Sequence, residues 1–88
     1  MQVNLTQAGK NALLWLRNRN GTGVFGKDGV LIAAGERAPI RRQTWNNLKL
    51  AGMLMIFEKR VTLVAEGWEV DLGRAQESED YHLLEPKV

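Results

Sequence analysis

The side chains that could do chemistry are concentrated between residues 40 and 52, in the stretch IRRQTWNNLKLAG. Asn and Gln amides can bond the edge of adenine, Arg can bond guanine, and Lys and Arg neutralise phosphates. A helix carrying such residues in its N-terminal half fits the major groove of double-stranded DNA. The alternative is an ordinary solvated helix face. The candidate DNA-binding residues in this stretch are Arg41, Arg42, Gln43, Thr44, Asn46, Asn47 and Lys49.

Other patterns in the chain do not favour catalysis. Residues 21–26, GTGVFG, match a glycine-rich phosphate loop, but such a loop follows a strand, whereas this one is predicted to follow a helix. We interpret it as a turn. His82 is the only histidine and there is no cysteine, so neither a metal site nor an activated nucleophile is expected. We therefore expect no cofactor and no enzymatic activity.

The charge is distributed unevenly along the chain. Residues 1–62 hold ten Lys or Arg against three acids, whereas residues 63–88 hold two against seven. A basic body favours a polyanionic partner, and an acidic end could compete with that partner or keep the chain in solution. The same division also arises by chance in small domains, and the sequence leaves both interpretations open.

Apolar residues at helical spacing predict a first helix over about residues 6–18, with Thr6 or Asn4 as its cap. The run LLWL at residues 13–16 wraps most of the helix circumference, so more than one face must be covered. Either the rest of the chain surrounds this helix or a second subunit packs on it. We expect a homodimer through this helix. The tryptophans at 15, 45 and 68 each fall in a separate amphipathic segment, which favours a core role over base stacking.

The segment from 21 to 39 has two interpretations. It suits a β-hairpin, or a lone strand followed by a short helix from Gly29 to Gly35, and we favour the short helix. Pro39 then precedes a helix that Gly52 closes in a left-handed conformation. The runs MLMIF and RVTLV predict a tight hairpin with a two-residue turn, and AEGWEVDL predicts a final helical turn or two.

This order of elements resembles the winged helix-turn-helix superfamily of small bacterial DNA-binding proteins, including regulators of the MarR type. The stretches that carry the resemblance are NNLKLAGML and KRVTLVAEG. It implies an α+β winged-helix fold, with a three-helix core and a small β-hairpin wing, over residues 1–72. Residues 41–49 would lie in the recognition helix, and Lys59 and Arg60 at the wing tip. The short wing loop, the uncapped APIRR turn and the lack of long dimerisation helices depart from the pattern.

These observations predict a single domain followed by an acidic, disordered tail over residues 73–88. The expected function is double-stranded DNA binding by a transcriptional regulator or an accessory factor of a phage or mobile element. The alternative is a protein–protein interaction module of the same fold that binds no nucleic acid. The longest apolar runs are five residues, and no signal peptide is evident, so we expect a soluble cytoplasmic protein without a membrane span.

Overall fold

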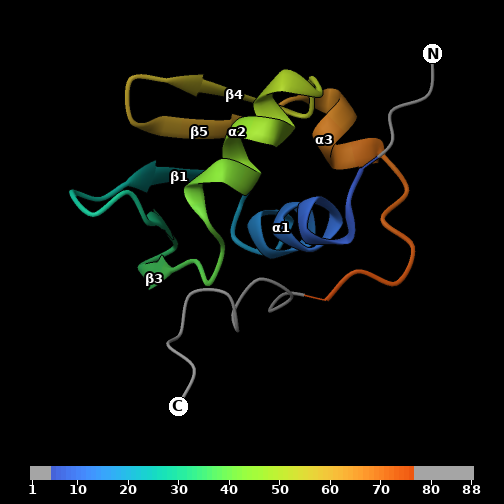
Figure 1. Cartoon of the computed structure of the whole chain (residues 1–88), viewed down its shortest axis with the longest axis horizontal. Coiled ribbons are helices and arrows are strands. Elements are labelled where there is room, and N and C mark those ends of the chain that lie inside the picture. The colour runs from blue at the N-terminus through green and yellow to red at the C-terminus, as the bar shows by residue number, and fades with distance from the viewer. Residues whose placement is uncertain (1–4, 77–88) are drawn as a thin grey trace.

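The computed structural model describes residues 5–76, and within this range the chain forms three helices and five strands (Figure 1). Residues 77–88, most of the predicted acidic tail, lie outside the described residues. None of the helices in the described part is long and apolar enough to cross a bilayer. The elements are α1 (Gln7–Arg17), β1 (Thr22–Phe25), β2 (Leu31–Ala33), β3 (Glu36–Arg37), α2 (Arg42–Leu50), β4 (Leu54–Phe57), β5 (Arg60–Leu63) and α3 (Ala65–Glu69).

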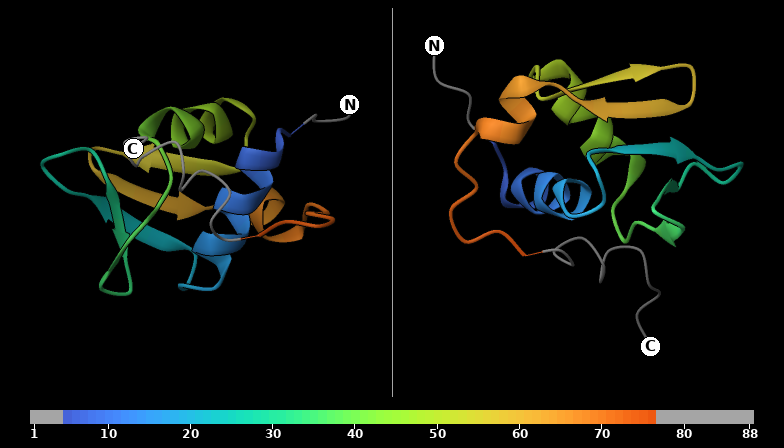
Figure 2. Two further views of the ribbon diagram at one scale, coloured as in Figure 1. Left: turned by 60° about the horizontal axis from the view of Figure 1, so that its bottom comes forward. Right: turned by 180° about the vertical axis from the view of Figure 1, so that it is seen from behind.

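All five strands join one antiparallel sheet in the order β3-β2-β1-β5-β4. The central strand β1 pairs with β2, its neighbour in sequence, and with β5, which lies about 40 residues further along the chain. Helix α2 lies over one face of the sheet, α1 lies at the ends of the strands, and the view from behind looks onto the other face with α2 beyond it (Figure 2). No helix of residues 5–76 covers this second face, which is called the open face below.

The core forms between the covered face of the sheet and the two long helices. Strand residues alternate, so that Phe25 and Leu31 on paired positions of β1 and β2 are buried while their neighbours point to the open face. Trp15 of α1 meets Trp45 of α2 edge-to-face, with ring centroids 6.5 Å apart and an interplanar angle of 62°. Both tryptophans are buried as predicted, whereas Trp68 is exposed.

The apolar run of α1 is covered by the rest of the chain. Leu13, Trp15 and Leu16 are all buried against the core. The helix therefore presents no broad apolar surface to a second subunit. The structure does not support the homodimer that was expected through this helix.

The predicted winged-helix architecture is wrong, although the α+β class holds. The segment expected to be a short helix between Gly29 and Gly35 instead contains strand β2, whose residues are alternately buried and exposed. Gly29 and Gly35 have positive φ angles of 82° and 79°, which suit the turns at either end of this strand and break a helix. The short helix that was expected directly before α2 is therefore replaced by a strand, and α2 is not part of a helix-turn-helix. The hairpins form a five-stranded sheet rather than a small wing.

Several local predictions are confirmed. The Thr6 hydroxyl accepts a hydrogen bond from the Gly9 amide at 3.0 Å and so caps α1. Gly52 follows α2 with a φ of 80°. The turn between β4 and β5 consists of Glu58 and Lys59, and α3 forms within the predicted AEGWEVDL segment.

The short helix α3 is held in place by one arginine and one glycine. Arg17, at the end of α1, donates to the carbonyl oxygens of Gly67 (2.9 Å) and Val70 (2.7 Å), and so binds the C-terminal end of α3. Burial lowers the pKa of Arg17 from its ordinary value, but the guanidinium remains protonated at neutral pH. A Cβ atom at Gly67 would collide with the carbonyl oxygen of Met53, so only glycine permits this close approach.

We expect Gly67→Ala to destabilise the protein by about 2 kcal/mol or more, because the added methyl group meets a backbone atom that cannot rotate away. Urea denaturation measures the change. Gly35→Ala is the matched control: its site is open within 4 Å, so it reports left-handed strain alone, about 1 kcal/mol. A Gly67→Ala variant that is no less stable than Gly35→Ala contradicts the close packing of α3.

Candidate nucleic-acid interface

Burial of one side of α2 decides which of its residues face outward. Trp45, Leu48 and Thr44 are buried, so Thr44 is not available to a partner. Asn46 is half-buried. In the rotated view, α2 lies above the sheet as the outermost element on that side (Figure 2). The other candidate residues of this stretch, all exposed, are Arg41, Arg42, Gln43, Asn47 and Lys49.

The amides on α2 are paired with residues one turn away. Gln43 donates from Nε2 to the Asn47 Oδ1 at 2.9 Å, and Arg42 donates from Nε to the Asn46 Oδ1 at 3.4 Å. Both pairs have the i, i+4 spacing of neighbours on a helix surface. The first pair is exposed, so its amides are held in a defined orientation while keeping donors and acceptors for a partner.

Arg42 also has a structural role. Its guanidinium carbon lies 3.8 Å from the centroid of the Phe25 ring, and Phe25 is only 3% exposed. The Phe25 amide in turn donates to the carbonyl oxygen of Lys59 at 2.8 Å. Phe25 thus joins the start of α2 to the turn between β4 and β5, and places Lys59 at the same end of the molecule as Arg42.

Arg60, the last candidate residue, lies apart from α2. It pairs with Val24 on β1 and with Phe57 on β4, and directly opposed residues in an antiparallel sheet share a face. Val24 and Phe57 are exposed on the open face, so Arg60 points there too, away from α2. The predicted site is therefore divided: Arg60 points away from α2, and Lys59 lies in the β4–β5 turn, whose residues line a hollow with Val24 and Phe57.

The open face carries a row of residues that sequence reasoning missed. From one edge of the sheet to the other, cross-strand pairing aligns Arg37, Ile32, Val24, Arg60 and Phe57. Val24, Phe57 and the β4–β5 turn line a shallow hollow at one end of this row. The alternation of apolar residues along β1 and β4 indicates which residues of each strand share a face. Which of them become neighbours across the sheet depends on the strand order and the register.

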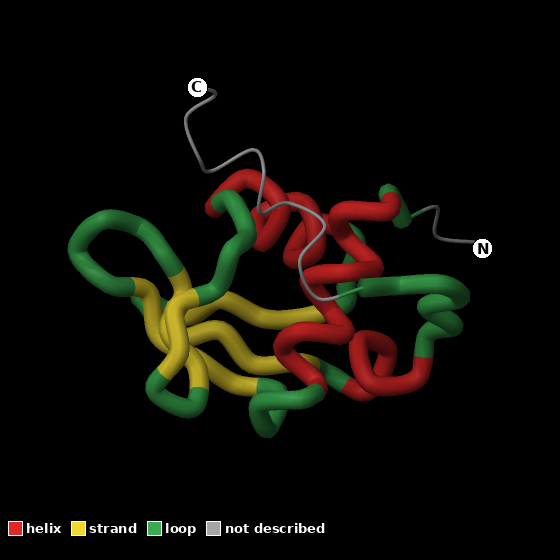
Figure 3. Tube along the Cα trace, turned by 90° about the horizontal axis from the view of Figure 1, so that it is seen from below, coloured by secondary structure: helices red, strands yellow, loops and turns green. Residues whose placement is uncertain are grey.

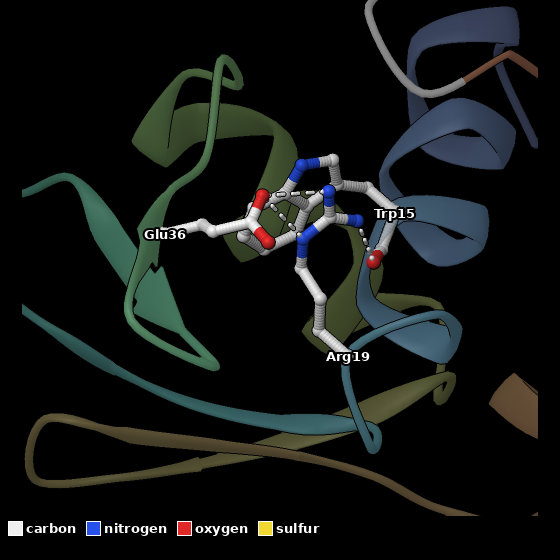
Figure 4. Close-up of polar contacts among 3 residues, drawn as sticks. All are labelled: Trp15, Arg19 and Glu36. Atoms are coloured by element: carbon white, nitrogen blue, oxygen red, sulfur yellow. Dashed lines mark hydrogen bonds and ion pairs between the residues drawn. The ribbon is translucent and has the colours of Figure 1, made fainter.

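Two arginines are engaged in ion pairs that fasten β3. Arg19 bonds the Glu36 carboxylate at 2.9 Å, donates to the Trp15 carbonyl oxygen at 3.0 Å and lies 4.2 Å from the centroid of the Trp15 ring (Figure 4). Arg37 bonds the Asp28 carboxylate at 2.7 Å. These two pairs connect β3 to the end of α1 and to the β1–β2 turn.

The hydrogen bond from Arg37 holds the pKa of Asp28 below its ordinary value, and a bond from the Val30 amide acts in the same direction. A carboxyl whose pKa is lower in the folded than in the unfolded chain adds stability above its unfolded pKa. That stability is lost as the pH falls through the folded pKa. Because the pair is exposed, the effect on folding is small.

The remaining cations near α2 have no such partner. Within residues 5–76, no carboxylate lies within 4.0 Å of Arg41, Arg42, Lys49 or Lys59. The acids Glu66 and Glu69 belong to α3, which lies away from the strand-connecting turns and beside the C-terminal end of α2 (Figures 1 and 3). The exposed cations of α2 and of the β4–β5 turn thus form no ion pair with a carboxylate among residues 5–76.

Comparison of the chain with known protein families, curated proteins and solved structures gives no match. In the described part of the chain, no group of three or more His, Asp or Glu side chains is placed to hold a metal ion. A function is therefore inferred from the chain's own surface, where the outer side of α2 carries exposed amides and cations.

We expect Arg42→Ala to lower the free energy of unfolding by about 1 kcal/mol, because it removes the cation from the face of Phe25 and exposes the ring. Arg41→Ala removes the same charge one residue earlier, where no aromatic contact exists, and should change stability by less than about 0.5 kcal/mol. Urea denaturation of both variants gives the comparison. Equal stability of the two variants would show that the Arg42–Phe25 contact contributes nothing.

Proposed function

We propose that the chain binds double-stranded DNA through the outer face of α2, as a transcriptional regulator or as an accessory factor of a phage or mobile element. The observation that supports this most is the set of exposed residues on α2, in which cations without carboxylate partners flank amides held in fixed orientations. The residues of this set are Arg41, Gln43, Asn47 and Lys49.

The dimensions of α2 are compatible with this role. A helix of nine residues is about 13 Å long, and the major groove is about 12 Å wide, so the outer side of α2 can enter it. Gln43 and Asn47 lie one turn apart and present amide groups of the kind that read adenine. The neighbouring sheet does not obstruct this approach, because α2 lies outermost on its side of the sheet.

Phosphate contacts would come from the cations around these amides. Arg41 begins the helix, Lys49 lies in its last turn, and Lys59 belongs to the turn that Phe25 joins to the start of α2. If Arg41, Arg42, Lys49 and Lys59 each neutralise one phosphate, log K should fall with log salt with a slope of about −3.6. Arg60 is left out of this surface because it points to the open face.

A second candidate function is protein–protein contact through α2 without nucleic acid. The observation that favours it is Leu50, an apolar residue at the end of α2 that is 83% exposed. Such a side chain gains more from an apolar partner than from a DNA groove. The DNA-binding experiment distinguishes the two functions, since a protein-binding helix gives no salt-dependent affinity for duplex DNA.

Fluorescence anisotropy with random-sequence duplex DNA, between about 50 and 200 mM salt, tests the proposal on the whole chain. Arg41→Ala should weaken binding several-fold and reduce the salt slope by about 1, because one phosphate contact is lost. Arg74→Ala is the matched control, since it removes an exposed cation from the segment after α3, and it should leave the slope unchanged. Equal effects of the two variants, or no binding at the lowest salt, would refute the proposal.

A double variant, Gln43→Ala with Asn47→Ala, tests base contact separately from charge. Its affinity for random DNA should change little, and its salt slope should stay the same, because neither residue is charged. Any preference among defined duplex sequences should fall, by about 1–3 kcal/mol for each lost bidentate contact. Preferences that survive in the double variant would place the base contacts elsewhere.

A further inference from the structure

The two edges of the sheet are protected to very different degrees. The edge strand β3 has two residues, both charged, and both are in ion pairs with other parts of the chain. The opposite edge strand, β4, has four residues with the sequence LMIF, without a charge or a proline. Charged, short edge strands resist pairing with another chain, whereas long apolar ones invite it. Only the β4 edge is suited to accept a further strand.

The backbone groups that face outward from β4 follow from the hydrogen bonds of its neighbour. The amides of Phe25 and Leu63 bond the carbonyl oxygens of Lys59 and Gly21, so the odd-numbered residues of β5 bond β1. The even-numbered residues of β5 therefore bond β4, at their opposed partners Met55 and Phe57. The amide and carbonyl groups of Leu54 and Ile56 point away from the sheet. No strand of residues 5–76 pairs with them.

Exposed apolar side chains gather at this same edge. The three most exposed large hydrophobic side chains of the described residues are Leu50 (83%), Phe57 (72%) and Met55 (59%). Met55 and Phe57 belong to β4 itself, on the open face. Leu50 ends α2, whose last turn bonds the residue before β4 through Met53 N and Leu48 O at 3.0 Å. Apolar surface thus lies along the strand and at its start.

We propose that the outer edge of β4 pairs antiparallel with β4 of a second copy of this chain, so that a two-fold axis joins two sheets into one. A partner strand must carry apolar side chains on both faces at strand spacing, and β4 itself meets this requirement. Only Leu54 and Ile56 can form the hydrogen-bonded pairs. Placing Ile56 opposite Ile56 of the second copy sets Met55 opposite Phe57 twice, a favourable sulfur–aromatic arrangement.

Charge also favours a second copy in this arrangement. Antiparallel pairing brings Glu58, which follows β4, toward the start of β4 in the other copy. There the last turn of α2 carries Lys49, a cation without a carboxylate partner among the described residues. The opposite charges meet once on each side of the two-fold axis.

The pairing has a geometric consequence for α2. A two-fold axis perpendicular to the sheet leaves the helices of both copies on the same side, so two α2 helices face the same direction. The dimer does not depend on DNA binding, and its test does not use DNA. Four paired residues and three apolar side chains form a small interface, so the dimer should be weak, with a dissociation constant in the micromolar range.

Sedimentation of the whole chain, from about 10 µM to 1 mM, tests the proposal. The wild-type mass should rise toward that of a dimer, and Phe57→Lys should raise the dissociation constant about tenfold or more, because it places a charge at the paired edge. Val24→Lys is the matched control on the open face: Val24 is 42% exposed but lies on the central strand β1, away from the edge. It should leave the dissociation constant unchanged.

Three outcomes would overturn the proposal: a monomer at every concentration, a dimer that survives Phe57→Lys, or a dimer that Val24→Lys disrupts equally, which would indicate packing through the open face.

Amide hydrogen exchange on the wild type tests the same proposal without a variant. Exchange at Ile56 should slow as concentration rises. Arg37 provides the internal control: because the Ala38 amide bonds Leu31, the Arg37 amide points outward from the β3 edge, and its exchange should not change.

Discussion

The contact between Trp15 and Trp45 determines the arrangement of the rest of the molecule. It is one of the contacts between α1 and α2, and both rings are buried in the core. With Trp45 fixed inward, the rotation of α2 about its axis is fixed as well, and Gln43 and Asn47 must point outward. Arg19 lies against the Trp15 ring and bonds Glu36, so the same contact also anchors the β3 edge.

Local structure was predictable from the sequence where one residue decides it. Thr6 as a cap, Gly52 after a helix and a two-residue turn at Glu58 each follow from short-range chemistry. The overall fold was not predictable, because the apolar run between Gly29 and Gly35 suits a helix or a strand equally well in isolation. Pairing with β1 selects the strand, and β1 in turn needs β5 from the far side of α2.

For the candidate site, too, the sequence predicted what depends on local spacing and not what depends on tertiary packing. Helical spacing puts Gln43 and Lys49 on the side of α2 opposite Trp45, with Asn47 at the boundary, and the structure leaves all three exposed. The same spacing puts Thr44 on the side of Trp45, and the structure buries it. Spacing could not show that Arg42 covers Phe25, because that contact depends on what packs against the helix. Nor could it place Arg60 on the opposite face from α2, since that follows from the register of β5 between two other strands.

The position of β1 at the centre of the sheet has a consequence for how the chain folds. On one side β1 pairs with β2, which follows it by a few residues. On the other side it pairs with β5, as the bond from the Leu63 amide to the Gly21 carbonyl shows. During synthesis on the ribosome, α1 and the first hairpin therefore emerge before β5, the second partner of β1, and before α2, which packs on α1. Closing this long loop is the entropically costly step, and most stabilising contacts form only after it. The domain should thus acquire its structure late in synthesis and in one cooperative event, with no stable N-terminal half.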